Sequence, residues 1–162
     1  MRQIAATVLI WLTPLMTVSA DPPAHSLTVY KTPTCGCCKQ WVTHLEANGI
    51  NVATVNQESL DAIKQKHGIT PRLSSCHTGV AAGGQYAFEG HIPAYLVARF
   101  LDNPPADAVG LSVPGMPVGS PGMEMGDGFR PYDVLLIKSD GDIEVYQEIS
   151  AIEQQHPPMH LP

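Results

Sequence analysis

The chain has 162 residues, a formal net charge of −6 at pH 7 and hydrophobic residues at 44% of its positions. A chain of this length can bury a core of its own, so its fold does not need disulfides as a small secreted module does. The acidic balance and the lack of a Lys/Arg cluster argue against nucleic acid as a partner.

The first 20 residues have the pattern of a secretory signal peptide. Arg2 supplies a positive charge, an apolar run follows over 4–16, and small residues occupy 18–20 before Asp21. The run is shorter than the roughly 20 apolar residues that span a bilayer. We therefore expect cleavage near Asp21 and no stable membrane insertion afterwards, with an uncleaved membrane anchor as the alternative.

The first half of the mature chain reads as a strand, a cysteine-bearing loop, a helix, a strand and a helix. Alternating β-branched and aromatic residues predict a strand at 27–30, and the spacing of apolar residues predicts a helix over 39–48. A second strand follows at 51–55 and a second helix over 58–67. This order implies two parallel strands joined by a right-handed crossover.

The middle of the chain adds two strands and a helix. Strands are predicted at 76–80 and 85–89, and Pro93 is a good first-turn residue for a helix over 92–101. The resulting β-α-β-α-β-β-α order is that of a thioredoxin-like domain. The predicted fold class is therefore α/β, with a mixed central sheet flanked by helices.

A loop rich in proline and glycine covers 114–131, and a β-hairpin is predicted after it. Its strands would occupy 133–138 and 142–146, joined by the turn at 139–141. We place this added hairpin at an edge of the same sheet. The domain would then span 21–150, with a flexible tail over 151–162.

Three of the four cysteines, Cys35, Cys37 and Cys38, lie within four positions. Cys35 and Cys38 have the C-x-x-C spacing of thiol-disulfide oxidoreductases, and a loop before a helix N-terminus favours the thiolate. Cys37 argues against a simple redox pair, because a disulfide could scramble among three neighbouring thiols. Disulfide exchange therefore stays open as one function of this motif.

A soft monovalent cation could be bound by all three sulfurs, because thiolates select Cu(I) and can bridge more than one ion. Cys76 begins the strand predicted beside the first one and is placed to be a fourth ligand. A zinc site built from all four cysteines competes, although structural zinc sites usually use two separated C-x-x-C knuckles. Structural disulfides remain a third alternative for an exported protein. The adjacent Cys37 and Cys38 argue against them, because both side chains cannot point toward well-placed partners without strain.

Four other residues are second-line candidates for metal ligands. His77 follows Cys76, but strand alternation would send its side chain to the opposite face unless the segment is irregular. His91 precedes a predicted helix and could instead cap it or bond locally. Met116 and Met123 lie in the Pro/Gly-rich loop, where thioethers either bind or guide copper, or fill packing gaps.

Other histidines and methionines carry weaker expectations. His44 and His67 fall in predicted helices and read as ordinary surface histidines. A weak, flexible copper site in the tail would use His156, Met159 and His160. The alternative is a tail without a binding function, since chain ends are often poorly ordered.

Five blocks of sequence carry a resemblance to a known family: VYKTPTCGCCKQWVTHLEANG, SCHTGV, FEGHIPA, GLSVPGMPVGSPGME and PYDVLL. They resemble an exported bacterial family catalogued as a domain of unknown function, whose named members are the CopG-type copper-resistance proteins. The resemblance implies a thioredoxin-like core, a periplasmic location, and copper bound by cysteines. Carried over residue by residue, it implicates Cys35, Cys37, Cys38 and Cys76.

The sequence therefore predicts a periplasmic copper-resistance protein that binds Cu(I), as one ion or a multinuclear cluster, through these four thiolates. Cycling between Cu(I) and Cu(II) is part of this hypothesis, and whether the protein is an enzyme stays open. Its expected partners are copper ions and other periplasmic copper-handling proteins. The alternative is a thiol-disulfide oxidoreductase that uses Cys35 and Cys38.

Overall fold

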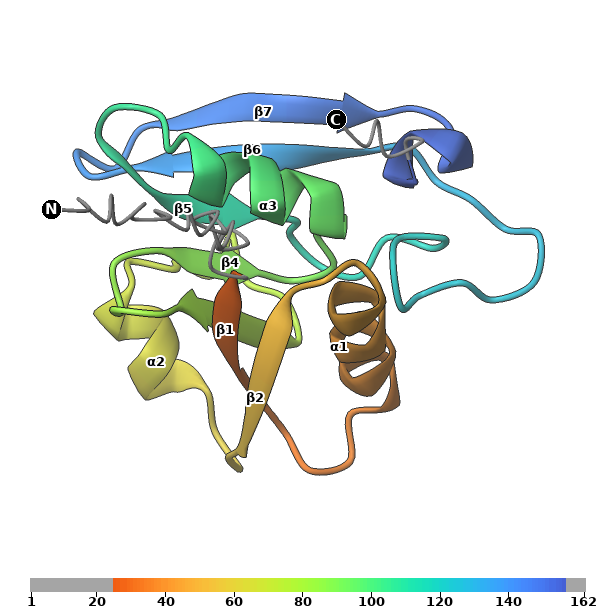
Figure 1. Ribbon diagram of the computed structural model, residues 1–162, viewed down its shortest axis with the longest axis horizontal. Coiled ribbons are helices and arrows are strands. Elements are labelled where there is room, and N and C mark those ends of the chain that lie inside the picture. The colour runs from red at the N-terminus through yellow and green to blue at the C-terminus, as the bar shows by residue number, and fades with distance from the viewer. Residues whose placement is uncertain (1–24, 157–162) are drawn as a thin grey trace, which may run out of the picture.

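A computed structural model describes residues 25–156 (Figure 1). The predicted signal peptide over 1–20 and the tail residues Met159 and His160 lie outside this range. Within it, no helix combines the length and the apolar character that crossing a membrane requires.

The described residues form one mixed, seven-stranded sheet in the order β2-β1-β3-β4-β5-β6-β7. The pairs β1·β2 and β4·β5 are parallel and the other neighbouring pairs are antiparallel. The strands are β1 (Ser26–Lys31), β2 (Asn51–Asn56), β3 (His77–Ala81), β4 (Ala87–Glu89), β5 (Ala108–Ser112), β6 (Tyr132–Lys138) and β7 (Ile143–Ile149).

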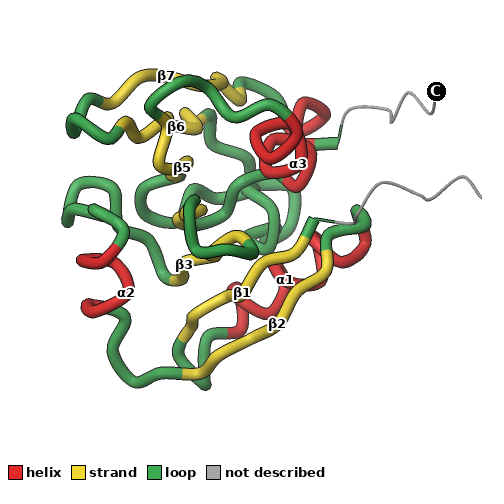
Figure 2. The backbone as a smooth tube through the Cα atoms, turned by 60° about the vertical axis from the view of Figure 1, so that its left-hand side comes forward, coloured by secondary structure: helices red, strands yellow, loops and turns green. Residues whose placement is uncertain are grey.

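Within residues 25–156, three α-helices cover the two faces of this sheet. Figures 1 and 2 show α1 and α3 on one face and α2 on the other. The helices are α1 (Gly36–Ala47), α2 (Asp61–Lys66) and α3 (Ala94–Asp102), and a 3-10 helix, η1, follows β7 (Ile152–Gln155). The predicted mixed α/β fold with a C-terminal hairpin is confirmed. Strands β1 to β4 have the order and directions that the thioredoxin-like prediction requires, and that class remains a prediction.

Aromatic side chains join the helices to the sheet. Trp41 of α1 is fully buried, and its indole N–H donates to the Ile92 carbonyl at 2.8 Å. Phe100 of α3 contacts Phe88 of β4 edge to face, with ring centroids 5.5 Å apart. Large buried rings contribute most of the apolar area in such a core. Trp41 therefore holds α1, and with it the cysteines at the start of α1, against this core.

The sequence did not predict β5, which lies between β4 and the hairpin. It has only five residues, and Gly110 interrupts its apolar pattern. A Cβ on Gly110 would come within 1.8 Å of the Ala87 carbonyl oxygen. The glycine that weakens the strand pattern is thus the residue that allows the close approach of β5 to β4.

The start of the segment predicted as a tail packs against the Pro/Gly-rich loop. Gln155 of η1 is buried, and its side-chain amide donates to the Gly119 carbonyl at 2.8 Å. Tyr132 donates to the Gln155 side-chain oxygen at 2.7 Å. These contacts hold the loop against the end of β7.

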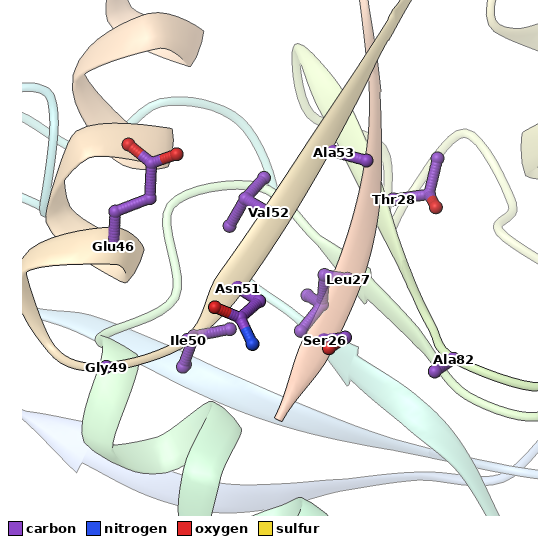
Figure 3. Close-up of a pocket in the computed structure, with 10 residues that line it drawn as sticks. All are labelled: Ser26, Leu27, Thr28, Glu46, Gly49, Ile50, Asn51, Val52, Ala53 and Ala82. Atoms are coloured by element: carbon purple, nitrogen blue, oxygen red, sulfur yellow. The ribbon is translucent and has the colours of Figure 1, made fainter. Parts of the chain in front are cut away.

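A cavity of about 650 Å³ opens between the end of α1 and the N-terminal ends of β1 and β2 (Figure 3). Cys35 follows the opposite end of β1, so this cavity is separate from the cysteines. It is lined by Ser26, Leu27, Thr28, Glu46, Gly49, Ile50, Asn51, Val52, Ala53 and Ala82.

His44 is not the simple surface histidine that its helical position suggests. Its Nε2 accepts the backbone N–H of Ala94, the first residue of α3, at 2.9 Å. Burial, and secondly the charge of His156, lowers the pKa of His44 to about 4. The ring therefore stays neutral and connects α1 to α3.

Acidification should destabilise the protein through His44. The neutral His44 ring contributes stability that is fully present above the ordinary histidine pKa of 6.5. This contribution is lost as the pH falls from 6.5 toward 4, because His44 binds a proton more readily in the unfolded chain. Urea unfolding at pH 7.5 and pH 4.5 measures this loss. His44→Gln, which can still accept the Ala94 N–H, should reduce it by on the order of 2 kcal/mol after allowance for partial exposure. Thr43→Gln, at the exposed position next to His44, is the control and should lose as much stability on acidification as the wild type. If His44→Gln also loses as much stability as the wild type, His44 is not the group responsible.

Candidate metal centre

The first three cysteines lie at the start of α1. The sequence placed them in a loop before a helix at residue 39, whereas α1 begins at Gly36. Cys35 is the N-cap, and its sulfur accepts the backbone N–H of Cys38 at 3.3 Å. Cys38 is buried, while Cys35 and Cys37 are partly exposed. The helix signals missed this first turn because cysteine and glycine are weak helix formers.

Cys76 reaches the same place from another part of the chain. It directly precedes β3, and the antiparallel pairing of β3 with β1 puts His77 opposite Lys31. The Cys76 Sγ atom lies 4.0 Å from the Cys37 Sγ atom. The four sulfur atoms all lie within 4.8 Å of one another. The structure therefore brings the four predicted cysteines together.

Two of these cysteines form a disulfide in the structure. Cys35 is bonded to Cys38, whereas Cys37 and Cys76 are free thiols. The Cys37 sulfur lies 3.4 Å from the Cys35 sulfur. A four-thiolate metal site therefore requires this disulfide to be reduced first.

Two buried histidines adjoin Cys76. The Cys76 sulfur is 3.2 Å from Nδ1 of His77 and 3.1 Å from Nε2 of His91. Strand alternation does not separate His77 from Cys76 as expected, because Cys76 lies in a bend outside the β3 ladder. His91 donates its Nδ1–H to the Pro121 carbonyl at 2.8 Å, which leaves the Nε2 lone pair directed toward Cys76.

The titration behaviour of this group follows from its burial. Burial, and for His77 also the charge of His91, lowers the pKa of both imidazoles. Burial, followed by the charge of Cys37, raises the pKa of the Cys76 thiol to about 12. Without a cation the site therefore holds neutral imidazoles and a protonated Cys76. A bound cation stabilises the Cys76 thiolate, so binding releases a proton.

A buried ion pair supports the segment that carries Cys76. The Glu89 carboxylate has no exposed side-chain area and pairs with Lys64 of α2. It also accepts the Ser75 N–H and the Thr78 hydroxyl, each at 2.6 Å. Ser75 and Thr78 flank Cys76 in sequence, so Glu89 fixes both sides of the bend. Sequence reasoning missed this carboxylate, although a single acid at the end of an apolar strand was its signal.

The loop methionines are placed differently from one another. Met123 and Met125 line a hollow of about 370 Å³ beside Cys37, together with Gly36, Gln40, Gly122 and Glu124. Met116 is 52% exposed and is not among these lining residues. Of the two methionines predicted as second-line candidates, the structure thus brings only Met123 next to the cysteines.

Comparisons with known proteins show the family to which the chain belongs. A family model described as a protein of unknown function, DUF411, matches residues 73–123. A solved structure described as copper resistance protein CopG, form 1, is 41% identical, with a TM-score of 0.73, over 79% of this chain and 99% of that chain. A second, described as form 2, is 40% identical, with a TM-score of 0.73, over 78% and 98%. No curated protein matches the chain. The chain belongs to the family of the copper resistance protein CopG.

Proposed function

We propose that the protein binds Cu(I) as its cargo and thereby contributes to copper resistance in the periplasm. The convergence of the four cysteine sulfurs within 4.8 Å of one another carries this proposal. Thiolates are soft ligands and prefer Cu(I) to hard cations. The relatives described as copper resistance proteins support copper as the metal. Export through the N-terminal signal peptide and a thioredoxin-like fold belong to the same proposal.

The ligands of this proposal are the thiolates of Cys35, Cys37, Cys38 and Cys76, with His77 and His91 as additional donors. Several sulfurs within bridging reach favour more than one Cu(I) ion. Imidazole nitrogen suits Cu(II) as well as Cu(I). Cycling between the two oxidation states is therefore part of the proposal, with one electron passing to or from a periplasmic copper-handling partner.

A second candidate function rests on the disulfide between Cys35 and Cys38. Cys35 is partly exposed and Cys38 is buried, so the Cys35 sulfur is the one that a partner thiolate can reach. In that reaction the thiolate of a reduced partner attacks the Cys35 sulfur, the disulfide breaks, and Cys38 takes up a proton. A second thiolate of the partner then releases Cys35, so the partner is oxidised and the protein is reduced.

Copper uptake and thiol counting test the main proposal. The fully reduced protein, kept without oxygen, should withdraw Cu(I) from a bicinchoninate complex and lose reactivity of its four thiols toward a thiol reagent. The same protein with the Cys35–Cys38 disulfide should take up less copper. Cys76→Ser should lower the copper content or the affinity. Four reactive thiols without copper uptake would contradict the proposal.

A further inference from the structure

We propose that the hollow beside Cys37 is the site through which Cu(I) reaches the cysteines, with Met123 and Met125 as its transient thioether ligands. We call it the loading hollow, and its lining comprises Gly36, Cys37, Gln40 and residues 122–125. This inference rests on the proposed copper-binding function and adds the route of loading to it.

Cys37 joins the loading hollow to the rest of the cluster. It is the one cysteine among the residues that line the hollow, and it is partly exposed. Its sulfur lies 3.4 Å from the Cys35 sulfur and 4.0 Å from the Cys76 sulfur. An ion bound at Cys37 therefore needs only local ligand exchange to reach other thiolates. Cys37 is also a free thiol whether or not Cys35 and Cys38 form their disulfide.

The loop holds Met123 in a fixed position beside this cysteine. The Met123 N–H donates to the Ser120 carbonyl at 2.7 Å, and its own carbonyl accepts the Gly119 N–H at 3.0 Å. Gly122 has a φ of +87°, and a Cβ there would lie 2.8 Å from the Cys37 carbonyl oxygen. Only glycine allows the loop to pack this closely on the first turn of α1. The loop backbone thus places Met123 at the hollow.

Met125 extends the same hollow toward solvent. Met125 is 73% exposed, so it does not fill a gap in the core. Glu124, between the two methionines, is exposed and accepts the Gly122 N–H at 2.7 Å. The lining of the hollow therefore includes two methionines and one acidic residue. This combination attracts cations and favours Cu(I) over hard cations such as Na⁺ and Mg²⁺.

The chemistry gives the transfer a direction. Neutral thioethers carry no charge to offset that of the ion, whereas Cys37 binds as a thiolate. When the ion moves from the thioethers to Cys37, a copper–thioether bond breaks, a copper–thiolate bond forms, and the thiol proton passes to water. Copper remains Cu(I) throughout. The methionines therefore speed loading without adding to the final affinity.

Loading kinetics test this assignment. The reduced, full-length protein is mixed with the Cu(I)–bicinchoninate complex, and the loss of the complex is followed by stopped-flow absorbance. Met123→Leu with Met125→Leu should slow the transfer by about tenfold. The equilibrium copper content and affinity should stay at wild-type values. Met116→Leu, in the same loop but outside the hollow, is the matched control and should load at the wild-type rate.

Three results would overturn the loading site alone while wild-type protein still takes up copper at equilibrium. They are an unchanged rate in the double variant, an equal slowing in Met116→Leu, and a fall in the copper content of the double variant. The last would make the methionines resident ligands. Failure of the wild-type protein to bind copper at equilibrium would instead overturn the proposed function and the loading site together.

Discussion

Cys37→Ser should lower the affinity for Cu(I) by about a hundredfold. Loss of a residue that only supports a metal ligand costs up to about this factor, and Cys37 is itself a proposed ligand. Serine keeps the size of the side chain but removes a soft sulfur that lies within 4.0 Å of two others. Competition titration with bicinchoninate under reducing, oxygen-free conditions measures the change. The copper content at saturation should also fall if Cys37 bridges ions.

The same variant separates the two candidate functions. Cys37 is not part of the Cys35–Cys38 disulfide, so Cys37→Ser should still catalyse disulfide exchange if the protein is an oxidoreductase. Cys35→Ser is the matched variant, because it removes both the disulfide and a proposed copper ligand. Wild-type copper affinity in Cys37→Ser, combined with loss of exchange in Cys35→Ser, would favour the oxidoreductase over the copper-binding protein.

The four cysteines could be predicted as metal ligands from the sequence because residue type and spacing alone indicate their chemistry. Three thiols within four residues are unusual, and the order of strands beside Cys76 predicts where the chain brings it. The disulfide between Cys35 and Cys38 was one of the alternatives left open. The position of His77 could not be predicted, because strand alternation applies only within a ladder and Cys76 lies just outside it.

The fold was predictable where hydrophobic periodicity was strong and not where a few residues decided the structure. The strand β5 was missed because its register depends on the close approach of Gly110 to Ala87, which no periodic pattern records. The N-terminus of α1 was placed three residues late because its cap is the side chain of Cys35, a residue outside the usual capping set. Both features depend on contacts rather than on propensity.

The Lys64–Glu89 pair is the part of the candidate site that the sequence did not reveal, because its partners come from α2 and β4. A buried acid needs a partner and hydrogen bonds to offset its loss of hydration. Glu89 finds them in Lys64, Ser75 and Thr78. The pair therefore helps to hold the Cys76 bend in place, as a positioning element behind the sulfur cluster.

Lys64→Met should destabilise the protein by about 3–5 kcal/mol, because it leaves the Glu89 carboxylate buried without its counter-charge. Urea unfolding of the copper-free, reduced protein measures the loss. Lys64→Met combined with Glu89→Gln removes both charges and should recover part of it, since no uncompensated charge remains. Lys66→Met, at an exposed position of the same helix, should change stability by less than about 0.5 kcal/mol. A loss of under about 1 kcal/mol in Lys64→Met would contradict a stabilising role for the pair.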